Sequence, residues 1–435
     1  MHFCLPKRAL LAVGSLFGIL AIAFIVTRFL LPRTPKDNLP PTNLSVDQSI
    51  EDFFTAYWQR PIPLQGLAPA LFTEKEASLT PEACGSCHPQ QYSDWKESVH
   101  SKAMGPGPWG QIIDLFHSSP DEAMLCMTCH APLSEQSLLV AKSGTEEKGP
   151  FEKNPYFDSR LELQGITCAA CHVRQHRRFG PPKAEALAAS KYPTGMANHG
   201  GVERTPYFEK AEFCKDCHQF DPKDSVLING KPIQDTYREW KNSIWGQGDA
   251  SCQECHMPNR RHFWKGIHDE EWVKGGVRVD AEITQDRSAP ERAEIKVEVT
   301  NAAVGHKFPT YITPKVFVRA ALLDNAGNTI EGTQQERIIG WDARFEDGQW
   351  KEHFDTRIAP GEKFQADFRW RLPSQAKKIR AWVEVHPDHF YHNYFYAPYL
   401  QDQAISPEGR KLIQRALQES SRTPYLLFEK IIQLD

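Results

Sequence analysis

The stretch "EACGSCHPQQYSDWKESVH", residues 82–100, decides how the chain is organised. It contains the unit C-x-x-C-H, made by Cys84, Cys87 and His88, and a second histidine, His100, twelve residues after the first. The same five-residue unit occurs four more times along the chain. Together the five units use ten of the eleven cysteines, so they determine the role of almost every thiol.

C-x-x-C-H is the attachment motif of c-type haem. The two thiols add to the haem vinyl groups, and the adjacent histidine binds the iron from one side. One unit alone would equally suit a zinc knuckle or a disulfide, but five units with histidine in the same place favour five covalently bound haems c. The predicted attachment residues are Cys84, Cys87, Cys126, Cys129, Cys168, Cys171, Cys214, Cys217, Cys252 and Cys255, and the predicted proximal iron ligands are His88, His130, His172, His218 and His256.

Length and charge limit the remaining possibilities. A chain of 435 residues predicts two to four domains. The formal net charge of −4 gives no indication of a nucleic-acid partner. The eleven tryptophans suit a protein that packs aromatic rings against porphyrin faces.

The first residues predict export. Lys7 and Arg8 precede an apolar run over 9–27, which is about long enough to cross a bilayer as a helix. A cleaved signal peptide is the alternative, since Ala21 and Ala23 form an A-x-A match. Cleavage there would leave a strongly apolar new terminus, so we expect an uncleaved single-pass anchor in a bacterial inner membrane. Because c-type haem is attached outside that membrane, the rest of the chain is expected in the periplasm.

The distances between the motifs indicate how the middle of the chain folds. The first cysteines of successive units are 42, 42, 46 and 38 residues apart. About forty residues per haem leave few apolar side chains for an ordinary core, so haem faces must supply much of the buried apolar area. We therefore expect a mostly α-helical and irregular multihaem cytochrome c domain with a haem-filled core.

From residue 276 onward the pattern changes to apolar and polar residues in alternation. Five such runs, separated by turn signals such as "DNAGN" at Asp324, predict an all-β sandwich of immunoglobulin-like shape. Ser406 followed by Pro407 is typical of a helix start. The predicted division is a transmembrane anchor over 1–31, a linker and lead-in over 32–78, the pentahaem domain over 79–275, the β-sandwich over 276–400 and a C-terminal helical tail over 401–435.

Several segments resemble the multihaem cytochrome c superfamily, which includes the tetrahaem cytochrome of nitrifying bacteria and the hydroxylamine oxidoreductase group. The resemblance covers Cys84 to about Thr310 and rests on "CGSCHPQQYSDWKESVHSKAM", "CMTCHAPL", "GITCAACH", "FCKDCHQF", "TYREWKNS" and "CQECHMP". It implies that a histidine in the position of His100 binds the iron of a different haem. The segment 82–100 would then attach one haem and provide the distal iron ligand of a second haem.

The same resemblance implies the other distal ligands. They are His199, His262, His268 and His306, with His176 and then His117 as substitutes. A second copy of the W-x-x-S segment carries Trp245 where the first copy has His100. The second axial position of one haem iron would therefore be filled from another segment or stay free. A separate group, His386, His389 and His392, is expected to pack among aromatic rings, with a metal site as the alternative.

Two functions fit these features. The first is electron transfer along a chain of haems with two histidine ligands, between a membrane-side donor and an exported acceptor, with no catalytic residue. The alternative is a multihaem oxidoreductase that acts on a small nitrogen or sulfur compound at one five-coordinate haem. Redox proteins are the expected partners, and a homo-oligomer is possible under either reading.

Overall fold

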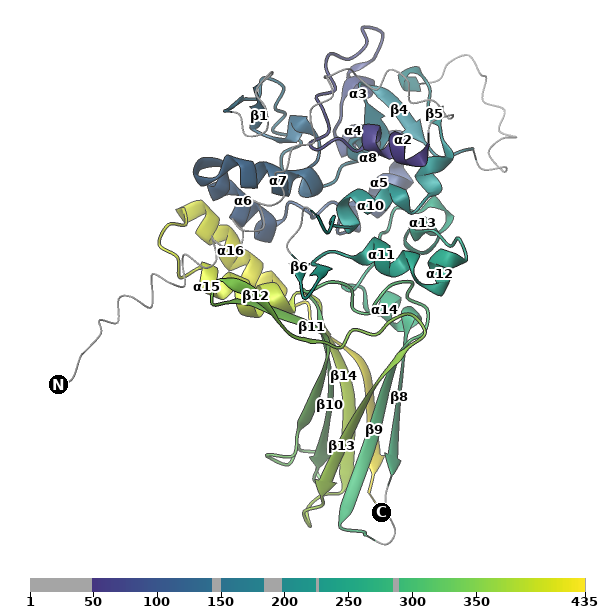
Figure 1. Ribbon diagram of the computed structural model, residues 1–435, viewed down its shortest axis with the longest axis vertical. Coiled ribbons are helices and arrows are strands. Elements are labelled where there is room, and N and C mark those ends of the chain that lie inside the picture. Colours follow the sequence, from purple (N-terminus) through teal and green to yellow (C-terminus); the bar gives the residue numbers. More distant parts are fainter. Residues whose placement is uncertain (1–48, 143–149, 184–197, 224–226, 285–288, 435) are drawn as a thin grey trace, which may run out of the picture.

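The computed structural model describes residues 49–142, 150–183, 198–223, 227–284 and 289–434. Figure 1 shows the helices that carry the C-x-x-C-H motifs at one end of the long axis and long strands at the other. The expected membrane anchor over 1–31 and residues 32–48 of the linker and lead-in lie outside the described residues. Within the described ranges, no helix combines the length and the apolar character needed to cross a membrane.

The haem region is built from short helices and very short strands. Its helices are α2 (Ile50–Tyr57), α3 (Glu74–Ala77), α4 (Pro81–Gly85), α5 (Pro89–Glu97), α6 (Pro106–Ser118), α7 (Pro120–His130), α8 (Cys168–His172), α10 (Glu212–His218), α11 (Thr236–Lys241), α12 (Ile244–Gln247), α13 (Cys252–His256) and α14 (Glu270–Gly276). Its strands are β1 (Leu139–Ala141), β2 (Phe151–Lys153), β3 (Val173–Arg174), β4 (Arg177–Gly180), β5 (Glu203–Arg204), β6 (Leu227–Ile228) and β7 (Lys231–Pro232).

Hydroxyl side chains start three of the helices that carry cysteines. Thr80, Thr167 and Ser251 each accept a hydrogen bond from the backbone N–H three residues further on, before α4, α8 and α13 respectively. Such N-caps satisfy N–H groups that a helix start leaves without a partner. The sequence thus specifies these helices locally, although each is too short to be stable alone.

Apolar side chains of the haem region are buried in small separate clusters. One joins α2 to later segments through Phe53, Tyr57, Phe179 and Phe208. Another lies between α6 and α7 and includes Trp109, and a third surrounds Leu133 and Leu161. Short helices around several small clusters agree with the expected mostly helical and irregular architecture.

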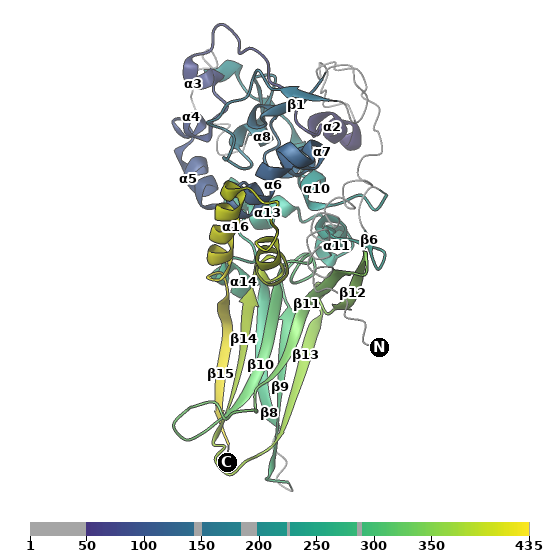
Figure 2. The same cartoon turned by 90° about the vertical axis from the view of Figure 1, so that its left-hand side faces the viewer.

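The β region consists of two antiparallel sheets that face each other. One sheet has the order β12-β11-β10-β14-β15 and the other has the order β13-β9-β8 (Figure 2). The strands are β8 (Val277–Thr284), β9 (Arg292–Asn301), β10 (Lys315–Leu323), β11 (Gln335–Glu346), β12 (Gln349–Asp355), β13 (Lys363–Arg371), β14 (Lys378–His386) and β15 (Tyr425–Gln433). The five alternating runs of the sequence correspond to β8, β9, β10, β13 and β14. The likeness to the immunoglobulin fold stays a prediction.

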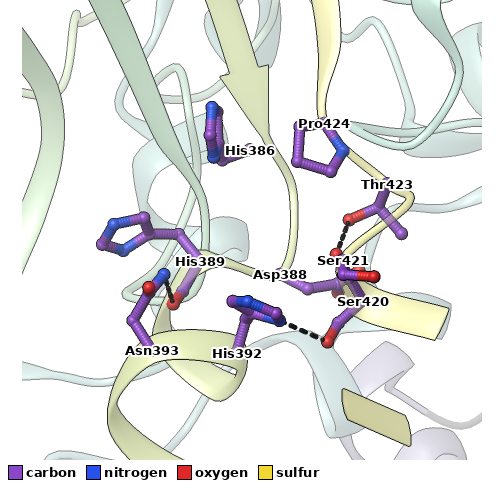
Figure 3. Close-up of a pocket in the computed structure, with 9 residues that line it drawn as sticks. All are labelled: His386, Asp388, His389, His392, Asn393, Ser420, Ser421, Thr423 and Pro424. Carbon is purple, nitrogen blue, oxygen red and sulfur yellow. Dashed lines mark hydrogen bonds between the residues drawn. The ribbon is translucent and has the colours of Figure 1, made fainter. Parts of the chain in front are cut away.

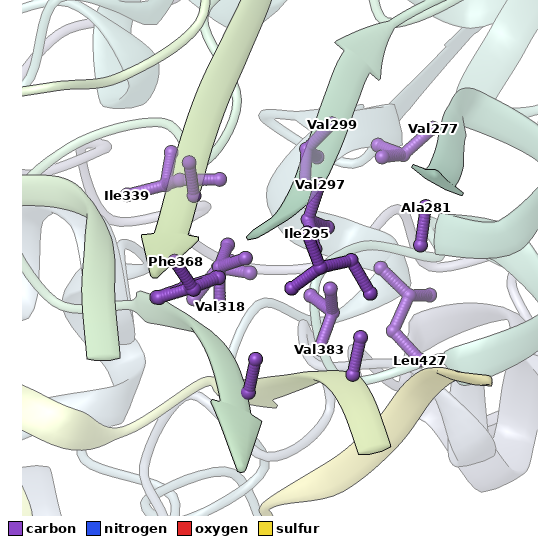
Figure 4. Close-up of a cluster of buried hydrophobic side chains, with 14 of the residues drawn as sticks. Val277, Ala281, Ile295, Val297, Val299, Val318, Ile339, Phe368, Val383 and Leu427 are labelled. Atoms are coloured by element: carbon purple, nitrogen blue, oxygen red, sulfur yellow. The ribbon is translucent and has the colours of Figure 1, made fainter. Parts of the chain in front are cut away.

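A single cluster of apolar side chains fills the space between these sheets (Figure 4). Every second residue of β9 is buried, so Ile295, Val297 and Val299 point into the core and meet Phe368 and Val383 from other strands. This period of two is what a strand with one covered face requires.

The last part of the chain differs from the expected helical tail. α15 (Ala397–Tyr399) and α16 (Pro407–Ser420) are helical, and Ser406 caps α16 as its sequence predicts. Residues 425–433, however, form β15, which pairs with β14 at the edge of the five-stranded sheet. That pairing joins segments about forty residues apart, so the local pattern does not reveal it. α16 itself packs on α6 of the haem region.

Candidate haem sites

The five motifs lie at or next to helix ends. We number them site 1 to site 5 in chain order, beginning at Cys84, Cys126, Cys168, Cys214 and Cys252. Site 1 starts in α4, and sites 2 to 5 coincide with the end of α7 and with α8, α10 and α13. None of the ten motif cysteines forms a disulfide. One turn of helix brings the two thiols of a motif to the same side as its histidine, as attachment of one haem requires.

Motifs far apart in the sequence adjoin in space. Thiols of different motifs lie close together in three pairs: Cys84 with Cys168, Cys129 with Cys217, and Cys214 with Cys252. Sites 1 and 3, sites 2 and 4, and sites 4 and 5 are therefore neighbours.

Three of the motif histidines face a second histidine ring. The ring centres of His172 and His262 are 6.2 Å apart, those of His218 and His100 are 6.4 Å apart, and those of His256 and His306 are 6.4 Å apart. An imidazole nitrogen binds a first-row metal at about 2 Å, so two histidines on opposite sides of one iron have ring centres roughly 6 Å apart. The residues at sites 3, 4 and 5 thus fit a haem iron held from both sides.

Site 1 has a histidine close to its motif histidine, although the two rings are not in contact. His199 is near enough to His88 for its charge to oppose protonation, and this effect, after desolvation, lowers the pKa of His88. His199 has a left-handed backbone with φ of 48° in the sequence "NHGG". Such a conformation is uncommon outside glycine and indicates that the surrounding contacts hold the residue in place.

Hydrogen bonds fix the tautomer of six of these histidines. The Nδ1–H donates to a backbone carbonyl in each, at 2.7 Å in His130, 2.8 Å in His172, 2.8 Å in His256, 3.1 Å in His199, 3.0 Å in His262 and 2.9 Å in His306. This leaves Nε2 without a proton and ready to bind a metal, as is usual for histidine ligands.

The surroundings also favour neutral imidazole. Desolvation lowers the pKa of His100 to about 3 and the pKa values of His172 and His218 to about 4. Neighbouring histidines add to the shift in each case. These residues are therefore in the form that binds iron throughout the neutral range.

Site 2 has no second histidine ring facing its motif histidine. Every histidine except His2 lies in the described part of the chain, and among these none is in ring contact with His130; none is in ring contact with His88 either, although His199 lies close to it. The substitutes suggested by the sequence do not fill the position. His176 donates from Nε2 to the Gly66 carbonyl at 3.0 Å, and His117 is exposed at the end of α6.

Tyrosines and an acid–histidine pair gather near the first cysteine of site 2. Tyr391 lies close to Cys126, Tyr311 and Asp388, which raise its pKa further after the larger effect of desolvation. Asp388 is also close to Tyr311 and accepts a hydrogen bond from His268 Nε2 at 3.0 Å. The loop after β14 thereby brings polar groups of the β region to this haem site.

His268 is the one expected distal ligand that has no motif histidine opposite it in the described structure. Its side chain is 41% exposed, and its Nε2 is engaged by Asp388 instead. Sequence reasoning missed Asp388, although the cluster "HPDHFYHNYFY" signalled it. Trp245, which replaces a histidine in the second W-x-x-S copy, lies beside Gly305 next to His306.

The group His386, His389 and His392 lines a cavity of about 270 Å³ between the end of β14 and the end of α16 (Figure 3). His392 Nδ1 is 3.0 Å from the Ser420 hydroxyl. His386 Nε2 and His389 Nδ1 are buried without a hydrogen-bond partner, and His386 Nε2 lies 3.6 Å from Glu384 Oε2. No set of three or more His, Cys, Asp or Glu side chains in the described ranges is arranged to hold a metal ion. The alternative of a metal site here therefore gains no support.

Comparisons with known proteins support a multihaem cytochrome c. Residues 67–271 match the family model described as cytochrome c552. The structure is similar to a penta-heme cytochrome c552 from Thermochromatium tepidum, with a TM-score of 0.56 and 17% sequence identity over 81% of this chain and 98% of that one. The chain has the fold of a multihaem cytochrome c.

One curated relative is cytochrome c nitrite reductase subunit NrfA of Nitratidesulfovibrio vulgaris. It is 23% identical over 206 residues, which span 44% of this chain and 37% of the relative. The match thus covers only part of that relative's length. These comparisons support covalently bound haem c, while the specific relation to the nitrifier group stays a prediction.

Proposed function

We propose that this cytochrome carries five haems c and acts as an oxidoreductase on a small nitrogen or sulfur compound. In this proposal sites 1, 3, 4 and 5 pass electrons, and site 2 holds the substrate. The observation that carries it is a contrast in facing rings: His172, His218 and His256 each face a second histidine ring and His88 has His199 close by, whereas no described histidine ring contacts His130.

The paired histidines suit electron transfer. When both axial positions are held by imidazole, a haem exchanges electrons without binding substrate. The carbonyl partners of Nδ1 hold His172, His262, His256 and His306 in a fixed orientation. Rigid ligands keep the structural change between the oxidised and reduced iron small. The neighbouring thiols of sites 5 and 4 and of sites 4 and 2 indicate a route for electrons from site 5 through site 4 to site 2.

The residues near site 2 suit substrate binding and proton supply. A haem with one free axial position supplies one-electron chemistry and a place for a small ligand. Asp388 accepts the Nε2–H of His268 and so orients its ring, with Nδ1 left to take up or release a proton. Tyr391 and Tyr311 add hydroxyl donors on the same side. The partial exposure of His268 allows exchange of protons with solvent.

Nitrite is the first compound to test, because the matched relative is named a nitrite reductase. Low-temperature EPR of the oxidised holoprotein should show one high-spin ferric haem and four low-spin ones. The high-spin signal should respond to nitrite, hydroxylamine or sulfite, with turnover when a reductant is supplied. His268→Gln should slow that turnover at least tenfold without changing the number of covalent haems.

An electron-transfer protein without a substrate is the second candidate, and the four sites with two histidines favour it. It would replace the first proposal if all five haems proved low-spin, or if the high-spin signal ignored every one of these compounds. Under both proposals the N-terminal apolar run anchors the chain in the inner membrane, and the haem and β regions exchange electrons with partner proteins in the periplasm. Sedimentation in detergent will establish whether a homo-oligomer forms.

A further inference from the structure

The distal ligands lie in loops whose backbone needs external support. His262 belongs to the loop between α13 and α14, where Asn259, Arg260 and Trp264 all have positive φ, at 54°, 60° and 41°. Residues other than glycine adopt this backbone conformation only where their surroundings impose it. Contacts from another part of the chain must therefore hold this loop.

A carboxylate from α5 supplies that contact. Asp94 Oδ2 accepts hydrogen bonds from the His262 N–H at 3.0 Å and from Arg261 Nε at 2.7 Å. Its Oδ1 accepts from Arg261 Nη2 at 2.6 Å and from Gln90 Nε2 at 3.1 Å. The Asp94 side chain is only 3% exposed, and the bidentate pair with Arg261 holds its pKa near 2. An ionised, nearly buried carboxylate with four donors is a rigid anchor.

Two other distal ligands show the same arrangement. Glu76 Oε1 accepts from the His199 N–H at 2.7 Å. Glu239 Oε2 accepts from the N–H of Lys307, the residue after His306, at 3.3 Å. In each case the acid comes from a segment distant in sequence, before site 1 or after site 4.

We propose that Asp94 is a positioning residue for His262, and that Glu76 and Glu239 act in the same way on His199 and His306. Each carboxylate fixes the backbone of a distal ligand so that its Nε2 stays opposite the motif histidine. Segment 82–100 then has three tasks: it attaches one haem, it sets the distal ligand of site 3 through Asp94, and it provides His100 opposite His218 at site 4.

The inference rests on the proposed function, in which His172 and His262 bind the iron of site 3. The test therefore measures this ligand pair and the role of Asp94 together. The holoprotein is prepared with Asp94→Ala, with His262→Ala and with both changes, and its high-spin ferric haem is counted by EPR alongside covalent haem content. We expect every variant to keep its covalent haems. His262→Ala should convert one haem to high-spin, Asp94→Ala should convert a large part of the same haem, and the double variant should match His262→Ala alone.

Asp342→Ala is the matched control. The Asp342 side chain is 5% exposed and pairs with Arg344, whose Nε and Nη2 lie 3.1 Å and 3.0 Å from Oδ2, and it belongs to β11, away from the backbone of the distal ligands. It should leave the spin states unchanged. If it produces the same high-spin haem as Asp94→Ala, the effect is structural and the proposal is wrong.

Other outcomes distinguish the assignment of His262 as a distal ligand from the positioning role of Asp94. If His262→Ala leaves all spin states as they were, the ligand assignment itself fails. If His262→Ala opens a haem and Asp94→Ala does not, only the positioning role fails. Where Asp94→Ala does not accumulate, Asp94→Asn is used, because it keeps the shape and one acceptor oxygen. It should give an intermediate high-spin fraction, and an unchanged low-spin spectrum would overturn the proposal.

Discussion

In the β region one cluster of 22 buried apolar residues runs between two sheets, whereas the three clusters nearest the motifs of the haem region hold seven residues or fewer each. The first core is made by the chain itself. In the second region the segments between clusters carry the attachment cysteines and the paired histidines. The difference indicates that one part of this protein folds by burying its own side chains and the other by enclosing its cofactors.

The strongest test of this comparison is to produce the full chain under conditions that prevent haem attachment. We expect the backbone amides of α4 to α13 to exchange with solvent within seconds, because short helices without packing partners are unstable. Amides of β9, β10 and β14 should stay protected. Hydrogen exchange followed by mass spectrometry measures both regions at once, and equal protection in the two would contradict the comparison.

A substitution inside the β core tests whether the β region can be destabilised without any change in the haem region. Phe368 is fully buried between the sheets, so Phe368→Ala should lower the free energy of unfolding of the β region by about 4 kcal/mol. Exchange of the β10 and β14 amides measures the loss. The haem spectrum should be unaltered, and a change in spin state would show that the two regions are more tightly coupled than we infer.

The boundary between the regions is held by charges. Arg357 of the β region and Glu239 of α11 pair at 3.0 Å, with side chains only 2% and 6% exposed. Arg357→Met leaves the carboxylate without its cation and should cost about 3 kcal/mol. Because Glu239 also holds the backbone beside His306, part of one haem should become high-spin.

An exposed pair provides the control for this change. Arg369 pairs with Glu294 at 2.8 Å and is 71% exposed. Arg369→Met should therefore cost no more than about 1 kcal/mol and leave the spin states unchanged. If the two variants behave alike, burial of the boundary pair is not what holds the regions together.

The smallest expected effect is a pH dependence in the β region. Desolvation lowers the pKa of Lys315 from 10.5 to about 8, and its Nζ donates to the Ile312 and Trp341 carbonyls. Between these two pKa values the unfolded chain binds more protons than the folded one, so stability rises as pH increases. The gain from pH 8 to pH 9 is about 1 kcal/mol. Exchange of β10 amides should show this gain in the native chain, and Lys315→Met should abolish it.

Some elements could be predicted from the sequence because their cause is local. The alternation of β8, β9, β10, β13 and β14 and the cap of α16 at Ser406 are of this kind. The alternation of apolar and polar residues does not predict β11 and β12. Both strands carry many charged residues, and a bulge between Asp342 and Ala343 shifts their register. β15 lies where the sequence predicts a helical tail. The local pattern does not reveal the strand, because its pairing with β14 depends on a distant segment.

The candidate sites divide in the same way. The five C-x-x-C-H units by themselves predict where haem is attached and which histidine binds first, because attachment needs only residues within one turn of helix. Which histidine lies opposite depends on loops brought together from different segments, and so only the tertiary structure paired His100 with His218 and His262 with His172. The tertiary structure also places His268 against Asp388, 120 residues further along the chain, and leaves His130 without a facing histidine among the described residues, because contacts between distant segments depend on the whole fold and not on a local pattern.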